Sequence, residues 1–305
     1  MASTVVIAHG WMGKRAAAAA QVCEALTHAG RTHRLVRTQH RGHAIDLAME
    51  AVNDGAAHVV AVGGDGTINE VVHGMLHAAA DPSRTDLAVI PCGSGNDVAR
   101  VLGLPTVTTA VQVAAAANAT RVLADVLDIT YTDYDGSTRQ RYCVNVADVG
   151  LGGHVARIRD QRLRALPGPL GYMVGIIAGM AVSAREEVDI HLDDRMATRT
   201  ALTVCIANNT WFGGGLGIAP DALWTDGVAD VVTIGNISVP AYVRHLPALR
   251  AARILRDHRI TYERASTVRV VHRRTPMPLE IDGEYVGTTP IEVRTRQAAL
   301  SVRTA

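Results

Sequence analysis

The first third of the chain alternates short apolar runs with longer segments in which apolar residues recur every three or four positions. The runs are typical of buried strands and the longer segments of amphipathic helices. The predicted strands are 5–8, 33–38, 58–62 and 86–90, and the predicted helices between them are 15–29, 43–54 and 68–79. Alternation of strand and helix with short connections predicts a doubly wound α/β fold with a parallel sheet.

The pattern changes after a further helix predicted at 108–117. Beyond it the chain consists mainly of alternating, strand-like runs, which indicate an antiparallel sandwich. These runs are 125–132, 140–149, 187–192, 200–208, 228–234, 267–271 and 292–302. One apolar stretch, 172–184, is shorter than the roughly twenty residues that a membrane span needs. We predict that it forms a buried or interfacial helix.

Composition supports an enzyme of two domains. The chain has 305 residues, of which 48% are apolar, and this content excludes disorder. A net charge of +1 argues against a general nucleic-acid binder. The four cysteines have neither paired nor zinc-site spacing and are predicted to be reduced thiols. Because no secretory signal precedes the first strand, we expect the protein in the cytoplasm.

A glycine-rich segment directly follows the predicted strand 58–62. It reads Gly63-Gly-Asp-Gly-Thr-Ile-Asn-Glu70 and leads into a predicted helix. Glycines let the backbone lie close to a polyphosphate, and the helix start presents the positive end of its dipole. Asp65 would repel bare phosphate, so it is expected to act through magnesium or its water shell. This segment predicts a kinase.

A second glycine turn follows the next predicted strand, as Pro91-Cys-Gly-Ser-Gly-Asn-Asp-Val-Ala-Arg100. Two such signals about thirty residues apart fit neighbouring parallel strands. Both turns then lie at the carboxyl edge of the sheet, where ligands bind.

Together these two motifs resemble the diacylglycerol kinase family, taken broadly to include sphingosine and ceramide kinases and the bacterial soluble lipid kinases. Later motifs follow in the family's order, so the resemblance spans nearly the whole chain. They are Asn145–Gly152, Asn208–Pro220, Asp226–Asp230 and Asp282-Gly283-Glu284.

The resemblance implies a nucleotide-binding α/β domain of the phosphofructokinase/NAD-kinase type, followed by an antiparallel β-sandwich that binds lipid. The last segment of the chain returns to the first domain in this family. The implied boundaries are 1–128 with 293–305 for the first domain and 129–292 for the second.

The resemblance also implies which residues contact ATP. Three regions contribute: the first loop, the end of the second strand and the two glycine turns, with Asn96 holding the second turn in shape. The residues are His9, Gly10, Trp11, Met12, Gly13, Thr38, Gly64, Asp65, Gly66, Thr67, Ile68, Asn69, Glu70, Ser94 and Asn96.

The first of these loops departs from the family. The family usually reads Asn-Pro-x-Ser-Gly-Lys there, whereas this chain has His9-Gly-Trp-Met-Gly-Lys14. The last glycine and the lysine are kept. The altered residues affect which nucleotide or lipid is favoured.

Residues 282–284 by themselves read as a hairpin turn between two strands. By resemblance, Asp282 and Glu284 face the γ-phosphate across an interdomain cleft. One of them accepts the proton of the lipid hydroxyl, and Asp65 organises the magnesium of ATP. The sequence does not decide between Asp282 and Glu284.

A second magnesium is implied in the loop 220–228, far along the chain from these motifs. Asp226 aligns with the family's carboxylate ligand, and Leu223 and Val228 would supply carbonyl oxygens. An Asp-Gly turn accounts for Asp226 nearly as well.

Three functions are consistent with these residues. The leading one is an ATP-dependent lipid kinase that phosphorylates diacylglycerol or a related lipid alcohol; the alternatives are a small-molecule kinase of the NAD-kinase kind and a catalytically weak nucleotide- or lipid-binding protein.

Arginine-rich runs at 244–274 and 157–164 predict transient docking at the inner membrane surface. An edge strand of the second domain offers a surface for a symmetric homodimer. The lipid itself is not specified by the sequence.

Overall fold

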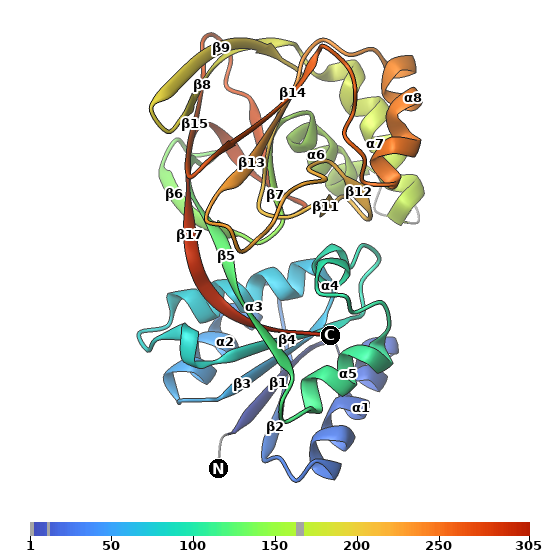
Figure 1. Cartoon of the computed structure of the whole chain (residues 1–305), viewed down its shortest axis with the longest axis vertical. Coiled ribbons are helices and arrows are strands. Elements are labelled where there is room, and N and C mark those ends of the chain that lie inside the picture. Colours follow the sequence, from blue (N-terminus) through green and yellow to red (C-terminus); the bar gives the residue numbers. More distant parts are fainter. Residues whose placement is uncertain (1–2, 11–12, 163–167) are drawn as a thin grey trace. The chain divides into compact units, whose positions relative to one another are not determined.

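The computed structural model describes residues 3–10, 13–162 and 168–305. The chain divides into two compact units, coloured along the sequence in Figure 1. Unit 1 comprises Met1–Asp125 and Gln297–Ala305, and unit 2 comprises Val126–Arg296. The chain passes between them in two long strands, β5 (Thr120–Thr132) and β17 (Glu284–Thr304).

Unit 1 is an α/β unit around a parallel sheet, which confirms the predicted fold class. The sheet order is β2-β1-β3-β4, and the end of β17 adds a further parallel strand beside β4. Its strands are β1 (Thr4–His9), β2 (His33–Thr38), β3 (His58–Gly63) and β4 (Asp86–Pro91). Every residue of β4 is buried, as expected for a strand covered on both faces.

Helices cover this sheet in pairs. Helix α1 packs with α5 and α2 packs with α3. The bounds are α1 (Lys14–His28), α2 (His43–Asn53), α3 (Asp65–His77), α4 (Asp97–Val101) and α5 (Val107–Ala115), with a 3₁₀ turn at Pro82–Arg84. Gly74 allows the close approach of α2 and α3, because a Cβ there would lie 2.1 Å from the carbonyl oxygen of Ile45.

Unit 2 has two layers of mainly antiparallel strands and a third layer of helices. The first layer runs β14-β13-β10-β7-β16-β17, and the second contains β9, β8, β15, β17, β5 and β6. The bounds not yet given are β6 (Thr138–Cys143), β7 (Val146–Gly150), β8 (Glu186–Leu192), β9 (Arg195–Ala201), β10 (Thr203–Ala207), β13 (Ala229–Ile234), β14 (Ile260–Ala265), β15 (Thr267–His272) and β16 (Pro278–Ile281), with a small separate hairpin of β11 (Trp211–Phe212) and β12 (Leu216–Gly217). The predicted sandwich is confirmed.

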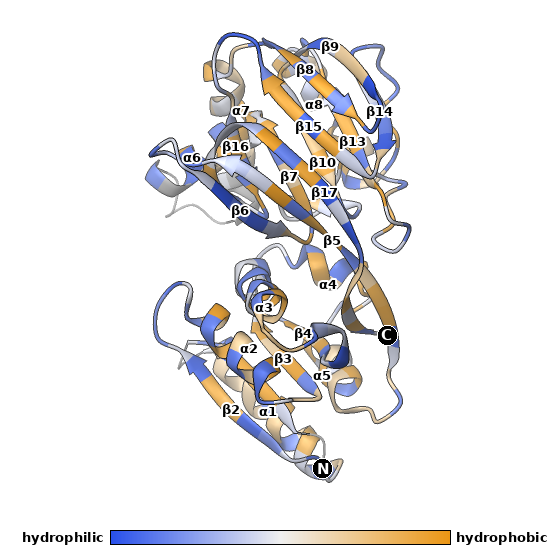
Figure 2. Cartoon of the chain, turned by 90° about the vertical axis from the view of Figure 1, so that its left-hand side faces the viewer, coloured by the Kyte–Doolittle hydropathy of each residue, from blue (hydrophilic) through white to orange (hydrophobic). Residues whose placement is uncertain are grey.

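Alternation along the strands builds the core of unit 2. On β10, Val204 and Ile206 face the cluster between the two strand layers, whereas Cys205 and Ala207 face a cluster shared with the helices. Hydrophobic positions therefore recur along these strands in Figure 2. The helices are α6 (Leu151–Arg162), α7 (Gly168–Val182) and α8 (Val239–Arg250).

Several predicted elements differ from the structure. The run 140–149 is two strands, because Val144 and Asn145 donate their amides to the Asp282 side chain between β6 and β7. Helix α3 begins at Asp65 and not at Ile68, since Gly64 already takes the N-cap position. Helices α6 and α8 were not predicted. Within the described residues, no helix is long and apolar enough to span a membrane.

Candidate active site

The two glycine turns of unit 1 are in direct backbone contact. Strands β3 and β4 are neighbours and parallel, so both turns leave the same edge of the sheet as predicted. The Cys92 amide donates to the Gly63 carbonyl at 2.7 Å. A Cβ on Gly93 would lie 2.6 Å from the Cα of Gly64, closer than real Cβ atoms approach. Glycine is required here because the two backbones touch.

Asp65 ties the first turn to the second. Its carboxylate accepts the Asn96 amide at 2.8 Å and the Val98 amide at 3.4 Å, at the start of α4. Asn96 adopts a left-handed conformation, with φ of 56°. Its side chain accepts the Gly93 amide at 2.9 Å and donates to the Gly93 carbonyl at 3.2 Å, which holds the second turn in shape.

The remaining residues of the first motif have different environments. The Ile68 and Asn69 side chains are buried, with 0% and 2% exposure, so they face the interior of unit 1. Glu70 accepts the amide of Gly42, the N-cap residue of α2, at 2.9 Å. Gly66 is exposed and Thr67 is partly exposed beside Gly63. In the second turn, Ser94 is exposed.

The end of β1 lies at the same edge of the sheet. His9 pairs in register with Thr38 of β2, and its Nδ1 lies 3.1 Å from the Thr38 hydroxyl. Arg37 donates to the Gly10 carbonyl at 2.8 Å. Gly13 is the N-cap residue of α1. The predicted contacts Trp11 and Met12 lie outside the described residues.

In unit 2, residues 282–284 form the tight hairpin turn between β16 and β17. Positive φ angles of 48° at Asp282 and 89° at Gly283 are those of a two-residue Asp-Gly turn. The Asp282 carboxylate accepts the amides of Val144 and Asn145, each at 2.8 Å, and the Cys143 thiol at 3.2 Å. Burial raises the pKa of Asp282, and these donors oppose that rise.

Glu284 has a different partner. Its carboxylate lies 2.6 Å from the guanidinium of Arg141, and both side chains are partly exposed, at 26% and 21%. Arg141 is on β6, far from the turn in sequence. Because a lone arginine in a strand carries no motif, the sequence did not indicate it.

Two further acids lie beneath the turn. Glu280 of β16 stands opposite Asp148 of β7, and both are buried. Burial and the neighbouring Asp148 raise the pKa of Glu280 well above its usual range, and Glu280 accepts the Gly283 amide. Burial also raises the pKa of Asp148. Asp148 lies within the motif 145–152, but the sequence did not assign it a role.

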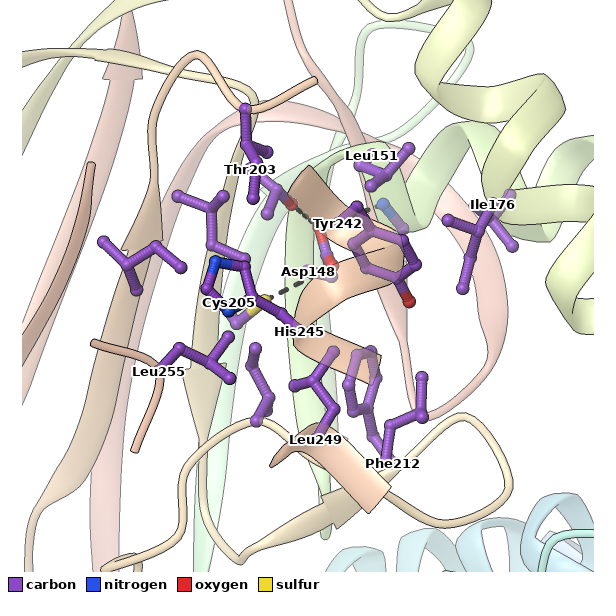
Figure 3. Close-up of a pocket in the computed structure, with 17 residues that line it drawn as sticks. Asp148, Leu151, Ile176, Thr203, Cys205, Phe212, Tyr242, His245, Leu249 and Leu255 are labelled. Atoms are coloured by element: carbon purple, nitrogen blue, oxygen red, sulfur yellow. Dashed lines mark hydrogen bonds between the residues drawn. The ribbon is translucent and has the colours of Figure 1, made fainter. Parts of the chain in front are cut away.

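Asp148 borders an apolar pocket beneath the helices of unit 2 (Figure 3). Its carboxylate accepts the Thr203 hydroxyl, the Gly152 amide at 3.1 Å and the Cys205 thiol at 3.4 Å. The cavity volume is about 40 Å³. The other labelled lining residues are Leu151, Ile176, Phe212, Tyr242, His245, Leu249 and Leu255.

The carboxylate of the predicted second magnesium site is already paired with an arginine. Asp226 pairs with the Arg264 guanidinium, and its other oxygen accepts the Val228 amide at 3.3 Å. Leu223 is 59% exposed. Within the described residues, no group of three or more His, Cys, Asp or Glu is arranged to hold a metal. The set Leu223, Asp226 and Val228 has a single carboxylate, which is paired with Arg264, and two carbonyl oxygens, so its role in binding magnesium stays a prediction.

Comparison with known proteins accounts for both units. Residues 4–129 match the diacylglycerol kinase catalytic domain, and residues 145–304 match the YegS C-terminal NAD kinase beta sandwich-like domain. A diacylglycerol kinase of Bacillus subtilis is 29% identical over 273 residues, which is 90% of this chain and 86% of the relative. One from Staphylococcus saprophyticus is 29% identical over 255 residues, or 83% and 78%.

Solved structures show the same fold. A diacylglycerol kinase crystal structure from Bacillus anthracis covers 100% of this chain and 97% of its own, with a TM-score of 0.72 at 17% identity. The chain thus belongs to the diacylglycerol kinase family of lipid-kinase-type phosphotransferases, whose two domains it carries in order.

Proposed function

We propose that this protein is an ATP-dependent lipid kinase that transfers the γ-phosphate to the hydroxyl of diacylglycerol or a related lipid alcohol. The observation that carries this proposal is the apolar pocket of unit 2 with Asp148 and Thr203 at its border. At about 40 Å³ the pocket holds only a small apolar group, so it supports an acceptor in which an apolar part lies next to a polar one.

Unit 1 supplies the nucleotide-binding groups in this proposal. Next to the touching turns, Gly66 has open space around it that leaves room for phosphate oxygens, and the start of α3 presents amide donors. A carboxylate offers about four lone-pair sites, and the two amides use two of those of Asp65. Asp65 therefore fits a contact to the hydration shell of magnesium, which supplies counter-charge to the phosphates.

The turn at 282–284 supplies the proton acceptor. A general base works best when its pKa lies near the working pH, and burial moves Asp282 in that direction. Glu284 is more accessible but is held by Arg141. The pH profiles of Asp282→Asn and Glu284→Gln distinguish them. In the variant that lacks the base, the remaining rate no longer falls as pH falls. In the other variant, the rate still falls as pH falls.

Membrane lipid is the proposed partner, and helix α7 supports this. The helix has no charged residue, yet Val174, Ile177 and Val182 on it are 37%, 44% and 61% exposed. Neighbouring α8 exposes Arg244 and Arg250. Apolar side chains beside arginines favour an anionic bilayer surface. High salt is expected to weaken vesicle binding, and salt-independent binding would contradict the electrostatic part.

The test is transfer of label from γ-labelled ATP with magnesium. The acceptors are diacylglycerol, a sphingoid base, a polyprenol and phosphatidylglycerol in micelles, with NAD as a soluble acceptor in parallel. We expect label in one lipid, and strongly reduced label from Asp282→Asn or Glu284→Gln, whichever removes the base. Label in NAD alone would replace the proposal with a small-molecule kinase. ATP binding without transfer to any acceptor would leave the weak binding protein.

A further inference from the structure

A second pocket of unit 2 lies where the end of β9 meets the segments on either side of α8. Its volume is about 310 Å³. It is lined by Arg199, Thr233, Asn236, His258, Arg259 and Thr261, among others. None of these residues belongs to the motifs of the kinase family, and the proposed reaction does not use them.

Three polar atoms on this pocket are buried and have no hydrogen-bond partner among the described residues. They are the hydroxyls of Thr233 and Thr261 and the Nε of Arg199. The two threonines stand opposite each other on β13 and β14, and Thr233 is 3% exposed. Native proteins rarely leave buried donors unpaired. Such a cluster beside a pocket points to a ligand that accepts hydrogen bonds.

Neighbouring acids hold the two arginines in place. Asp257 accepts from Arg259 at 2.8 and 2.6 Å, and Glu263 accepts from the terminal nitrogen of Arg199 at 3.1 Å. The Nε of Arg199 is therefore left for another acceptor while its fork is fixed. His258, whose side chain is 90% exposed, adds a ring at the pocket's entrance.

We propose that this pocket binds a phosphate group. A phosphate presents several strong acceptor oxygens, and Arg199, Thr233 and Thr261 supply an N–H and two O–H donors for them. Neutral sugars or alcohols would need as many donors as acceptors. Because Asp257 and Glu263 balance the charges of the two arginines, the unpaired donors carry the proposal, and net charge does not.

The phosphate has two possible sources, a soluble phosphate ester and a phospholipid headgroup. Asn236 in this pocket accepts from Arg185 at 3.1 Å, and Arg185 lies three residues after the end of α7, the apolar helix that we propose contacts the membrane. This connection favours the headgroup. The choice of a lipid source rests on the proposed function, whereas phosphate binding itself does not.

Titration of the full-length protein with inorganic phosphate, followed by ¹H–¹⁵N NMR, tests the proposal. The amides of Gly235 and Asn236 report on this pocket, and those of Gly66 and Gly93 report on the nucleotide turns. We expect saturable shifts at Gly235 and Asn236. Shifts confined to Gly66 and Gly93 would overturn this site and leave the kinase proposal intact. Shifts confined to Gly235 and Asn236 would support this site whether or not the kinase proposal holds.

Variants assign the binding to named donors. Thr233→Val and Thr261→Val keep the side-chain shape and remove one hydroxyl each, and together they are expected to weaken phosphate binding at least about tenfold. Thr198→Val is the matched control, because this exposed threonine of β9 bonds Asp189 outside the pocket. Unchanged affinity in the folded double variant would refute the proposal.

Vesicles identify the source. Glycerol 3-phosphate is compared with phosphatidylcholine vesicles that contain or lack phosphatidic acid. If the double variant loses selective binding to phosphatidic acid vesicles, the ligand is a headgroup. If only glycerol 3-phosphate binding is lost, it is a soluble ester. If neither binding responds to the variant, the pocket has no phosphate site.

Discussion

Asp65 of unit 1 and Asp282 of unit 2 hold their surroundings in the same way but in different environments. Each accepts two backbone amides from a segment far along the chain, Asn96 and Val98 in one case and Val144 and Asn145 in the other. Burial raises the pKa of Asp282. Two further buried acids, Glu280 and Asp148, stand opposite each other on strands β16 and β7 of the same unit. Both aspartates therefore fix the backbone around them, in addition to any role of their carboxylates in the proposed reaction.

The largest effect is expected from Asp282→Asn. The variant loses one of the two candidate bases and places an NH₂ group against an amide donor, so activity should fall by about 10²–10⁴-fold if Asp282 is the base. Unfolding free energy should fall by about 1–3 kcal/mol for the amide left unpaired. Kinase assay and urea unfolding measure the two effects.

Asp65→Asn is its counterpart. Its carboxylate accepts two amides, whereas that of Asp282 accepts two amides and a thiol, so we expect loss of activity with a smaller loss of unfolding free energy than for Asp282→Asn. Equal losses of unfolding free energy in the two variants would show that the two carboxylates stabilise their surroundings equally, and this would contradict the expected difference.

Gly93→Ala tests the contact between the two turns of unit 1. The added Cβ meets the backbone at Gly64, so the turns must separate, at a cost of about 1–3 kcal/mol in unfolding free energy and with a higher KM for ATP. Gly66→Ala is the control for stability, because its Cβ would have no atom within 4 Å. A Gly93→Ala variant as stable as Gly66→Ala would show that the contact is not required.

Ile176→Phe tests the pocket of unit 2. Ile176 is buried in the pocket lining, and the larger ring fills the cavity of about 40 Å³. We expect about tenfold lower kcat/KM for the lipid with ATP affinity unchanged. Ile254→Phe, which is 41% exposed and lies outside both the pocket lining and α7, is the matched control. Equal effects of both variants would remove the pocket from lipid recognition.

Glu280→Gln gives the smallest effect, and it depends on pH. The folded state keeps the Glu280 proton above the pKa of the unfolded chain, so the native state binds more protons over that range. Wild-type unfolding free energy then falls as pH rises from about 4.5 towards the folded pKa, by up to about 1.4 kcal/mol per pH unit from this group.

The glutamine cannot titrate, so the unfolding free energy of Glu280→Gln rises relative to that of the wild type as pH rises. Urea unfolding across this range measures the gain, with the surface change Glu292→Gln as control. A constant difference between wild type and Glu280→Gln would show that Glu280 titrates normally.

The sequence predicted unit 1 more completely than unit 2. Strands of unit 1 are buried on both faces and separated by regular helices, so periodicity alone locates them. In unit 2, α8 was missed because Pro240 and Pro247 obscure its helical period, and α6 was missed because Gly152 and Gly153 lie in its first turn. Those glycines fit against Asp148 and Pro278, which only packing requires.

The sequence by itself determined the order of the elements, the two glycine turns and the Asp-Gly turn, because these depend on local periodicity and on backbone angles that few residues adopt. Only the tertiary structure decided the partners of the side chains. Arg141 beside Glu284, Glu280 opposite Asp148, and the unpaired donors at Thr233 and Thr261 come from strands distant in sequence. Their chemistry arises from strand register and burial, and neither leaves a local mark on the chain.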